Sequence, residues 1–166
     1  MGLIRYQRTD VPPSFADPLP FVMRPILPVA LYGLKGRIEV NALVDTGASE
    51  TVIPLEFWEQ IDPLFREGEV GDLTAANGAV FPVKYGTVDL EIRPDKKQIR
   101  WNAKVAFTAA RDEMVLGDAG FFRYFAVEFN RANLSFEVRR SGHLPPQLLT
   151  MMPSEPMNRP FRKVIE

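Results

Sequence analysis

The sequence predicts an all-β domain with one or two short helices. Through most of the middle of the chain, apolar and polar residues alternate with a period of two, as in strands that bury one face. Short clusters of Gly, Asn, Asp and Pro separate these runs and indicate turns. Six of the 15 prolines precede residue 29 and five follow residue 144. We therefore expect an extended arm over 1–22, the domain over 23–140 and a Pro-rich tail over 141–166.

The first elements of the domain follow from local signals. "ILPVALY" (26–32) and "RIEVNALV" (37–44) flank a Gly-Leu-Lys-Gly turn and predict a hairpin. "TVIP" (51–54) predicts a short strand. "PLEFWEQI" then predicts one or two helical turns that start with Pro54, because proline is favoured in the first turn of a helix.

The second half of the domain predicts two more hairpins and a helix. The dipeptide Asn77-Gly78 lies between two apolar runs and favours a two-residue type I′ turn. Asp118 is a candidate helix N-cap for "DAGFFRYF". The other expected elements are a strand at 87–92, a turn at 93–100, a strand at 101–108, a short buried strand at 114–117 and a closing hairpin at 125–138.

Composition excludes several kinds of chemistry. The chain has 20 Lys and Arg against 21 Asp and Glu, so charge gives no reason to expect nucleic acid or an anionic membrane as partner. The absence of cysteine excludes a disulfide scaffold, a thiol nucleophile and a Cys-ligated zinc site. His143 is the only histidine. Acid–base chemistry therefore falls to carboxylates, Lys or Tyr, with no metal or cofactor. The first ten residues lack an apolar signal segment, and we expect a cytoplasmic protein.

One stretch, "LVDTGASETVIP" (43–54), combines a carboxylate with two apolar strands. A structural turn is one interpretation of Asp45-Thr46-Gly47, because Asp side chains often bond to turn backbone. Catalysis is the other, since buried strands on both sides would hold the Asp45 carboxylate in a fixed position. Gly47 would supply backbone freedom in the turn.

In its context this stretch resembles the retropepsin-like aspartic proteases. The resemblance spans about residues 26–139 and includes, in order, "ALVDTGASETVIP", the "TAANG" hairpin tip and "VLGDAGFFRYFAVEFN". It implies a retropepsin-like acid-protease barrel. It also implies that the strand before Gly117 passes beside the Asp-bearing loop and forms with it a ψ-shaped motif.

The resemblance further implies an aspartic endopeptidase that acts on polypeptides as a homodimer. Such proteolysis needs two adjacent carboxylates that share a proton, and this chain has a single Asp-Thr-Gly. Asp45 of each subunit would be catalytic, Thr46 would bond to the partner's loop, and Gly47 would hold the turn. The expected substrate-binding residues are Ala48 beside this turn and the flap residues Ala76, Asn77 and Gly78.

The chain departs from the retroviral pattern at Ser49 and Asp118, where retroviral members carry an Asp and an Arg that pair. This departure favours cellular or bacterial relatives, in which we expect the hairpin at 124–139 to build the dimer sheet. Two alternatives remain open. One alternative to the endopeptidase is a weakly active or inactive dimerisation or peptide-binding module. The other is a protease held latent by its Pro-rich tails.

Overall fold

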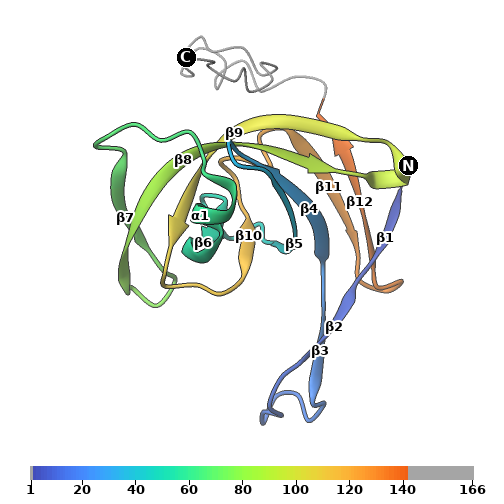
Figure 1. Cartoon of the computed structure of the whole chain (residues 1–166). Coiled ribbons are helices and arrows are strands. Elements are labelled where there is room, and N and C mark those ends of the chain that lie inside the picture. Colours follow the sequence, from blue (N-terminus) through green and yellow to red (C-terminus); the bar gives the residue numbers. More distant parts are fainter. Residues whose placement is uncertain (1, 142–166) are drawn as a thin grey trace.

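A seven-stranded sheet forms the body of the protein in the computed structural model, which describes residues 2–141 (Figure 1). Its strand order is β4-β5-β10-β6-β9-β8-β7, and β4 also pairs with β8. The predicted all-β fold is confirmed. The strands are β4 (Ile26–Tyr32), β5 (Arg37–Val44), β6 (Val52–Pro54), β7 (Val70–Thr74), β8 (Val80–Ile92), β9 (Ile99–Thr108) and β10 (Met114–Leu116).

Two smaller sheets come from the ends of the described chain. β1 (Leu3–Arg5), β12 (Ser135–Arg140) and β11 (Phe125–Asn130) form a three-stranded sheet in that order. β2 (Gln7–Asp10) and β3 (Phe21–Arg24) form a separate antiparallel ribbon. The backbone of the N-terminal arm is extended, but its pairing with the final hairpin and its folding into a ribbon were not apparent from the sequence. His143 and the tail beyond residue 141 lie outside the described residues.

The apolar faces of the strands form the core together with side chains of the short helical segment. Trp101, Val105 and Phe107 on β9 are nearly fully buried, as the period of two predicts. The 3-10 turn η1 (Leu55–Phe57) and helix α1 (Trp58–Ile61) follow Pro54, as predicted. The Trp58 ring packs edge-on against Phe107 at 4.9 Å between ring centroids. No helix within residues 2–141 has the length and apolar character needed to cross a membrane.

The helix predicted to begin at Asp118 is not formed. Residues 120–124 are a series of turns, and Gly120 has φ +95°, which a right-handed helix cannot contain. The turns bury Phe121 completely, and the Trp101 indole donates a 2.9 Å hydrogen bond to the Gly120 carbonyl. Phe125 then opens β11 and stays in the same aromatic core.

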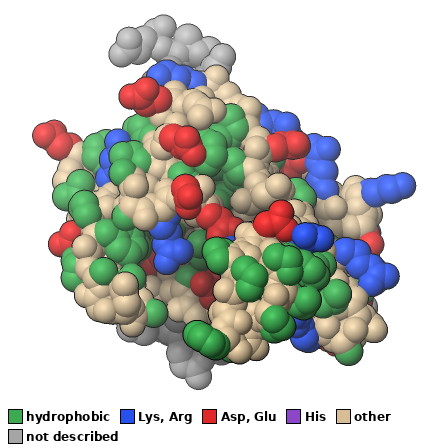
Figure 2. Space-filling view, turned by 90° about the horizontal axis from the view of Figure 1, so that it is seen from below, with side chains coloured by type: hydrophobic (Ala, Val, Ile, Leu, Met, Phe, Trp, Pro, Cys, Tyr) green, Lys and Arg blue, Asp and Glu red, His purple; other side chains and the backbone are tan. Residues whose placement is uncertain are grey.

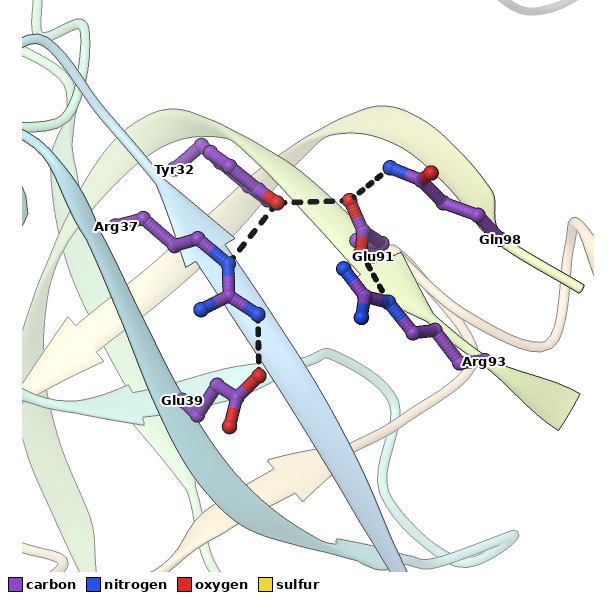
Figure 3. Close-up of polar contacts among 6 residues, drawn as sticks. All are labelled: Tyr32, Arg37, Glu39, Glu91, Arg93 and Gln98. Carbon is purple, nitrogen blue, oxygen red and sulfur yellow. Dashed lines mark hydrogen bonds and ion pairs between the residues drawn. The ribbon is translucent and has the colours of Figure 1, made fainter. Parts of the chain in front are cut away.

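β8 buries polar side chains on the face opposite Val88, Leu90 and Ile92. Asp89 and Glu91 are only 3% and 1% exposed. Tyr32, Gln98 and Arg93 all donate hydrogen bonds to the Glu91 carboxylate, at 2.8, 2.7 and 2.8 Å (Figure 3). The turn that carries η2 (Pro94–Lys96) connects β8 to β9, as predicted.

Neighbouring donors and cations compensate the charge of these two buried carboxylates. Burial raises the pKa of Glu91, but the hydrogen bonds from Tyr32, Gln98 and Arg93 outweigh it and hold the pKa below its usual value. Asp89 pairs in the same way with Arg100, at 2.9 Å. The lowered pKa keeps Glu91 ionised, and both buried carboxylates have hydrogen-bond and ion-pair partners, as buried polar groups in proteins usually do.

Candidate active site

Asp45 follows directly after β5, in the loop that leads to β6. β10 comes from far along the chain and lies between these two strands, parallel to β5 and antiparallel to β6. The Asp45 amide donates a 3.1 Å hydrogen bond to the carbonyl of Leu116, the last residue of β10. The expected ψ-shaped arrangement of this loop and the strand before Gly117 is thus present.

The turn holds the Asp45 side chain by its own backbone. The Gly47 amide donates a 2.8 Å hydrogen bond to Asp45 Oδ1, and the Ala48 amide donates to the Asp45 carbonyl at 3.2 Å. Gly47 does not have a positive φ, so the predicted need for backbone freedom there is wrong. A Cβ at this position would instead lie 3.2 Å from Asp45 Oδ1, and close approach to the carboxylate favours glycine.

The segment after β10, residues 117–119 (the bracing segment), holds the loop by backbone hydrogen bonds. The amides of Asp118 and Ala119 donate to the carbonyls of Ala48 and Ser49, both at 2.9 Å. At Gly117 a Cβ would lie 2.3 Å from the Glu50 carbonyl oxygen, so only glycine permits this approach. The loop that carries Asp45 is therefore fixed by backbone contacts along most of its length.

Sequence reasoning missed Thr51, which contacts the segment that holds the Asp45 loop. It is fully buried, and its Oγ1 accepts a 3.2 Å hydrogen bond from the Gly117 amide. Its own amide donates to the Ala119 carbonyl at 2.8 Å. The only sequence signal that could have pointed to it is a hydroxyl residue between the Asp45 turn and the apolar strand at 52–54.

The site opens to the surface. Asp45 and Ala48 are half-buried, whereas Thr46 and Gly47 are exposed. The Thr46 side chain makes no hydrogen bond to another residue within 2–141. A cavity of about 580 Å³ lies elsewhere, between β1 and the η2 turn, and Asp45 does not border it. In a single chain, the Asp45 turn therefore lies at the surface and does not line this cavity.

The β7–β8 hairpin carries the other predicted site residues. Its tip is a three-residue loop, not the predicted type I′ turn, because the Ala75 amide bonds to the Ala79 carbonyl at 2.8 Å and Asn77 has no positive φ. Gly78 does have a positive φ of 83°, as three-residue hairpin loops require. Ala76, Asn77 and Gly78 are all exposed.

The tip makes no hydrogen bond to the Asp45 turn within residues 2–141. The hairpin contacts the loop further from its tip, where the Tyr85 hydroxyl of β8 donates a 3.3 Å hydrogen bond to Glu50 Oε1. Burial and the neighbouring Glu50 carboxylate raise the pKa of Tyr85 to about 12, so the phenol keeps its proton. No group of three or more acidic or histidine side chains in the described part of the chain could hold a metal ion.

Residues 29–118 match the family model described as aspartyl protease. This match covers more than half of the chain and includes the Asp45 turn, the hairpin tip and Gly117. The chain belongs to the aspartyl protease family. The resemblance inferred from the three motifs is confirmed at this level.

Two solved structures are similar to this aspartyl protease. One is a retropepsin-like aspartic protease from Rickettsia conorii, 16% identical, with a TM-score of 0.44, covering 82% of this chain and 99% of its own. The other is EIAV protease complexed with the inhibitor HBY-793, 18% identical, with a TM-score of 0.40, covering 57% of this chain and 82% of its own. No curated protein matches the chain.

Proposed function

We propose that this protein is an aspartic endopeptidase whose active site forms between two identical subunits. The observation that carries the proposal is the Asp45 turn, which β10 and the segment after it hold by backbone hydrogen bonds while the turn itself stays exposed. Rigid support behind an accessible carboxylate is what acid–base catalysis requires. The family match adds to this geometry.

The chemistry needs two carboxylates about 3 Å apart that share one proton, since both cannot stay ionised at that distance. One carboxylate takes a proton from the attacking water, and the other, protonated, polarises the scissile carbonyl. A single Asp45 per chain supplies half of this pair. A two-fold dimer with Asp45 of each subunit near the axis supplies both halves.

The neighbouring residues have roles that follow from their place in this arrangement. The Thr46 side chain, unbonded within its own described chain, is free to bond to the partner's loop. Exposed Gly47 and half-buried Ala48 flank the carboxylate, where an extended peptide would lie. The hairpin tip at Ala76, Asn77 and Gly78 would close over that peptide as a flap and exclude water.

The test is a peptide-library digest between pH 4 and pH 7 by the wild-type protein and by Asp45→Asn. We expect the variant to fold and dimerise but to cut nothing. Asp118→Asn is the matched control, because Asp118 lies in the bracing segment and pairs with Arg123 at 2.9 Å. Equal cleavage by wild type and Asp45→Asn would refute the proposal, and absence of cleavage by both would favour a non-catalytic module.

Mixed dimers test the shared dyad directly. If both Asp45 residues are needed, a wild-type subunit paired with an Asp45→Asn subunit is inactive. Activity should then fall as the square of the wild-type fraction when the two proteins are mixed and allowed to exchange subunits. A linear fall would mean that each chain carries a complete active site.

A further inference from the structure

The ribbon formed by β2 and β3 projects away from the rest of the domain (Figure 1). Its four cross-strand pairs run from Gln7 with Arg24 to Asp10 with Phe21, and neither strand pairs with any other strand of the described chain. Isolated two-stranded ribbons have little stability of their own in water. A ribbon of this kind needs a surface to pack against.

The tip of the ribbon, residues 11–20, presents apolar side chains to solvent. The Phe15 side chain is completely exposed and Leu19 is 50% exposed. Figure 2 views the molecule from the side toward which the ribbon projects, and apolar side chains gather on the part nearest the viewer. An exposed aromatic side chain on a projecting element is typical of an interface anchor.

The tip nevertheless has a defined internal structure. The Val11 amide donates to the Pro20 carbonyl at 3.0 Å, which closes the loop at its base. Asp17 is bonded on both sides, since its carbonyl accepts from the Ser14 amide at 2.8 Å and its Oδ1 accepts from the Leu19 amide at 3.0 Å. Phe15 is therefore presented on a preformed loop, which lowers the entropy lost when a partner binds.

The base of the ribbon lies beside the candidate active site. Directly after β3, the Pro25 carbonyl accepts a 3.0 Å hydrogen bond from the amide of Val44, the residue before Asp45. Ile26, the first residue of β4, pairs with Leu43. The ribbon therefore leaves the domain next to the position that the proposed dimer axis would occupy.

We propose that the ribbon is a clasp that packs its tip onto a second copy of this chain, in an inference that rests on the proposed dimeric active site. Four residues per strand give the paired part a length of about 13 Å, before the tip is added. The two Asp45 carboxylates would be about 3 Å apart, so the axis lies close to the ribbon base. A ribbon of this length reaches past the axis, and two-fold symmetry makes the contact reciprocal. The clasp thus stabilises the dimer and places part of each chain beside the other's cleft.

The test uses a double variant that carries both Phe15→Ala and Leu19→Ala. Its control is the single variant Leu34→Ala. Leu34 is a matched control because it is 48% exposed and lies in the turn at the opposite end of β4. We expect the dimer dissociation constant, measured by sedimentation, to rise at least tenfold in the double variant, since each dimer loses two tips. The control should stay within about twofold. Cleavage of a short peptide at saturating dimer concentration should match wild type, because the substitutions leave the Asp45 turn unchanged.

A second variant removes the tip and leaves the strands intact. Asp10 and Phe21 are cross-strand partners, so Asn-Gly in place of residues 11–20 can join them through a two-residue turn. The same rise in dissociation constant should result. A photoreactive phenylalanine analogue at position 15 should cross-link to the other subunit, which mass spectrometry of mixed isotope-labelled dimers would identify.

An unchanged dissociation constant in both variants would overturn the clasp. If that constant is unchanged while the KM for a protein substrate rises and that for a short peptide does not, the ribbon binds substrate and the clasp is again wrong. A wild-type chain that stays monomeric overturns the clasp as well. Protease activity is decided separately by the Asp45→Asn comparison, so the two proposals fail in distinguishable ways.

Discussion

Replacing Thr51 by valine tests whether the contact between Thr51 and the segment after β10 positions the Asp45 turn. The substitution keeps the shape of the side chain and removes the hydroxyl that accepts from the Gly117 amide at 3.2 Å. Thr51 is fully buried, so water cannot replace that acceptor. A buried amide left without a partner costs about 1–3 kcal/mol of stability. For a chain of this size, about 2 kcal/mol corresponds to a fall of about 4–8 °C in Tm.

The effect on catalysis should exceed the effect on stability. Gly117 leads into the amides that hold Ala48 and Ser49, so a shift there moves the Asp45 turn. Displacement of a catalytic group by about 1 Å can lower the rate by about a hundredfold. We expect kcat for a peptide substrate to fall about 10- to 100-fold, with little change in KM, because the peptide-binding surface is not altered.

Thr108→Val is the matched control. Thr108 is 2% exposed, and its Oγ1 donates to the Pro82 carbonyl at 2.9 Å and accepts from the Ala110 amide at 3.1 Å. These bonds lie away from the Asp45 turn, so the control should lose stability and retain kcat. Differential scanning calorimetry and steady-state kinetics on both variants are sufficient. If Thr51→Val loses stability but keeps its kcat, the bracing segment does not position Asp45.

Three further changes have defined outcomes. Gly117→Ala should destabilise the fold by about 1–3 kcal/mol in urea unfolding, because its Cβ would meet the Glu50 carbonyl oxygen. An unfolding midpoint equal to that of the wild type would show that the loop accommodates the added methyl group without loss of stability. Gly78→Val and Gly68→Val both place a branched side chain at positive φ in open space, but only Gly78→Val should lower kcat, and equal kinetics would exclude a flap. Glu91→Gln should be less stable than wild type at pH 7, and the difference should shrink as pH falls below the ordinary Glu pKa of 4.5. The reason is that a lowered pKa adds stability only while the carboxylate is ionised; a gap in urea unfolding that does not shrink at all as pH falls below 4.5 would contradict it.

Local signals in the sequence predicted most of the elements. The hairpin of β4 and β5, the helical turns after Pro54 and the strand β9 all follow from the period of two and from turn residues within a few positions. The Asp45 turn was also found locally, because its two apolar flanks and its Asp-Thr-Gly are contiguous. Interactions between residues close in sequence are those that pattern reasoning captures.

Features that depend on distant contacts were missed. The burial of Asp89 and Glu91 depends on partners from β4, β9 and the turn between β8 and β9, none of which alternation reveals. The Pro-rich composition of 11–20 predicted an arm but concealed an ordered tip. The helix predicted at Asp118 failed because Gly120 adopts a left-handed conformation that buries Phe121, a tertiary preference that outweighs local propensity.

The insertion of β10 between β5 and β6 has a consequence for the order of assembly. While the chain is being synthesised, the Asp45 turn lacks the support of β10 until residues 114–119 have left the ribosome, because the backbone groups that hold the loop from outside belong largely to that segment. Contacts between segments so far apart in sequence form slowly, since a long loop must close first. A nascent chain therefore carries its carboxylate in a turn without this support, and the proposed active site can form only after nearly the whole domain has been made.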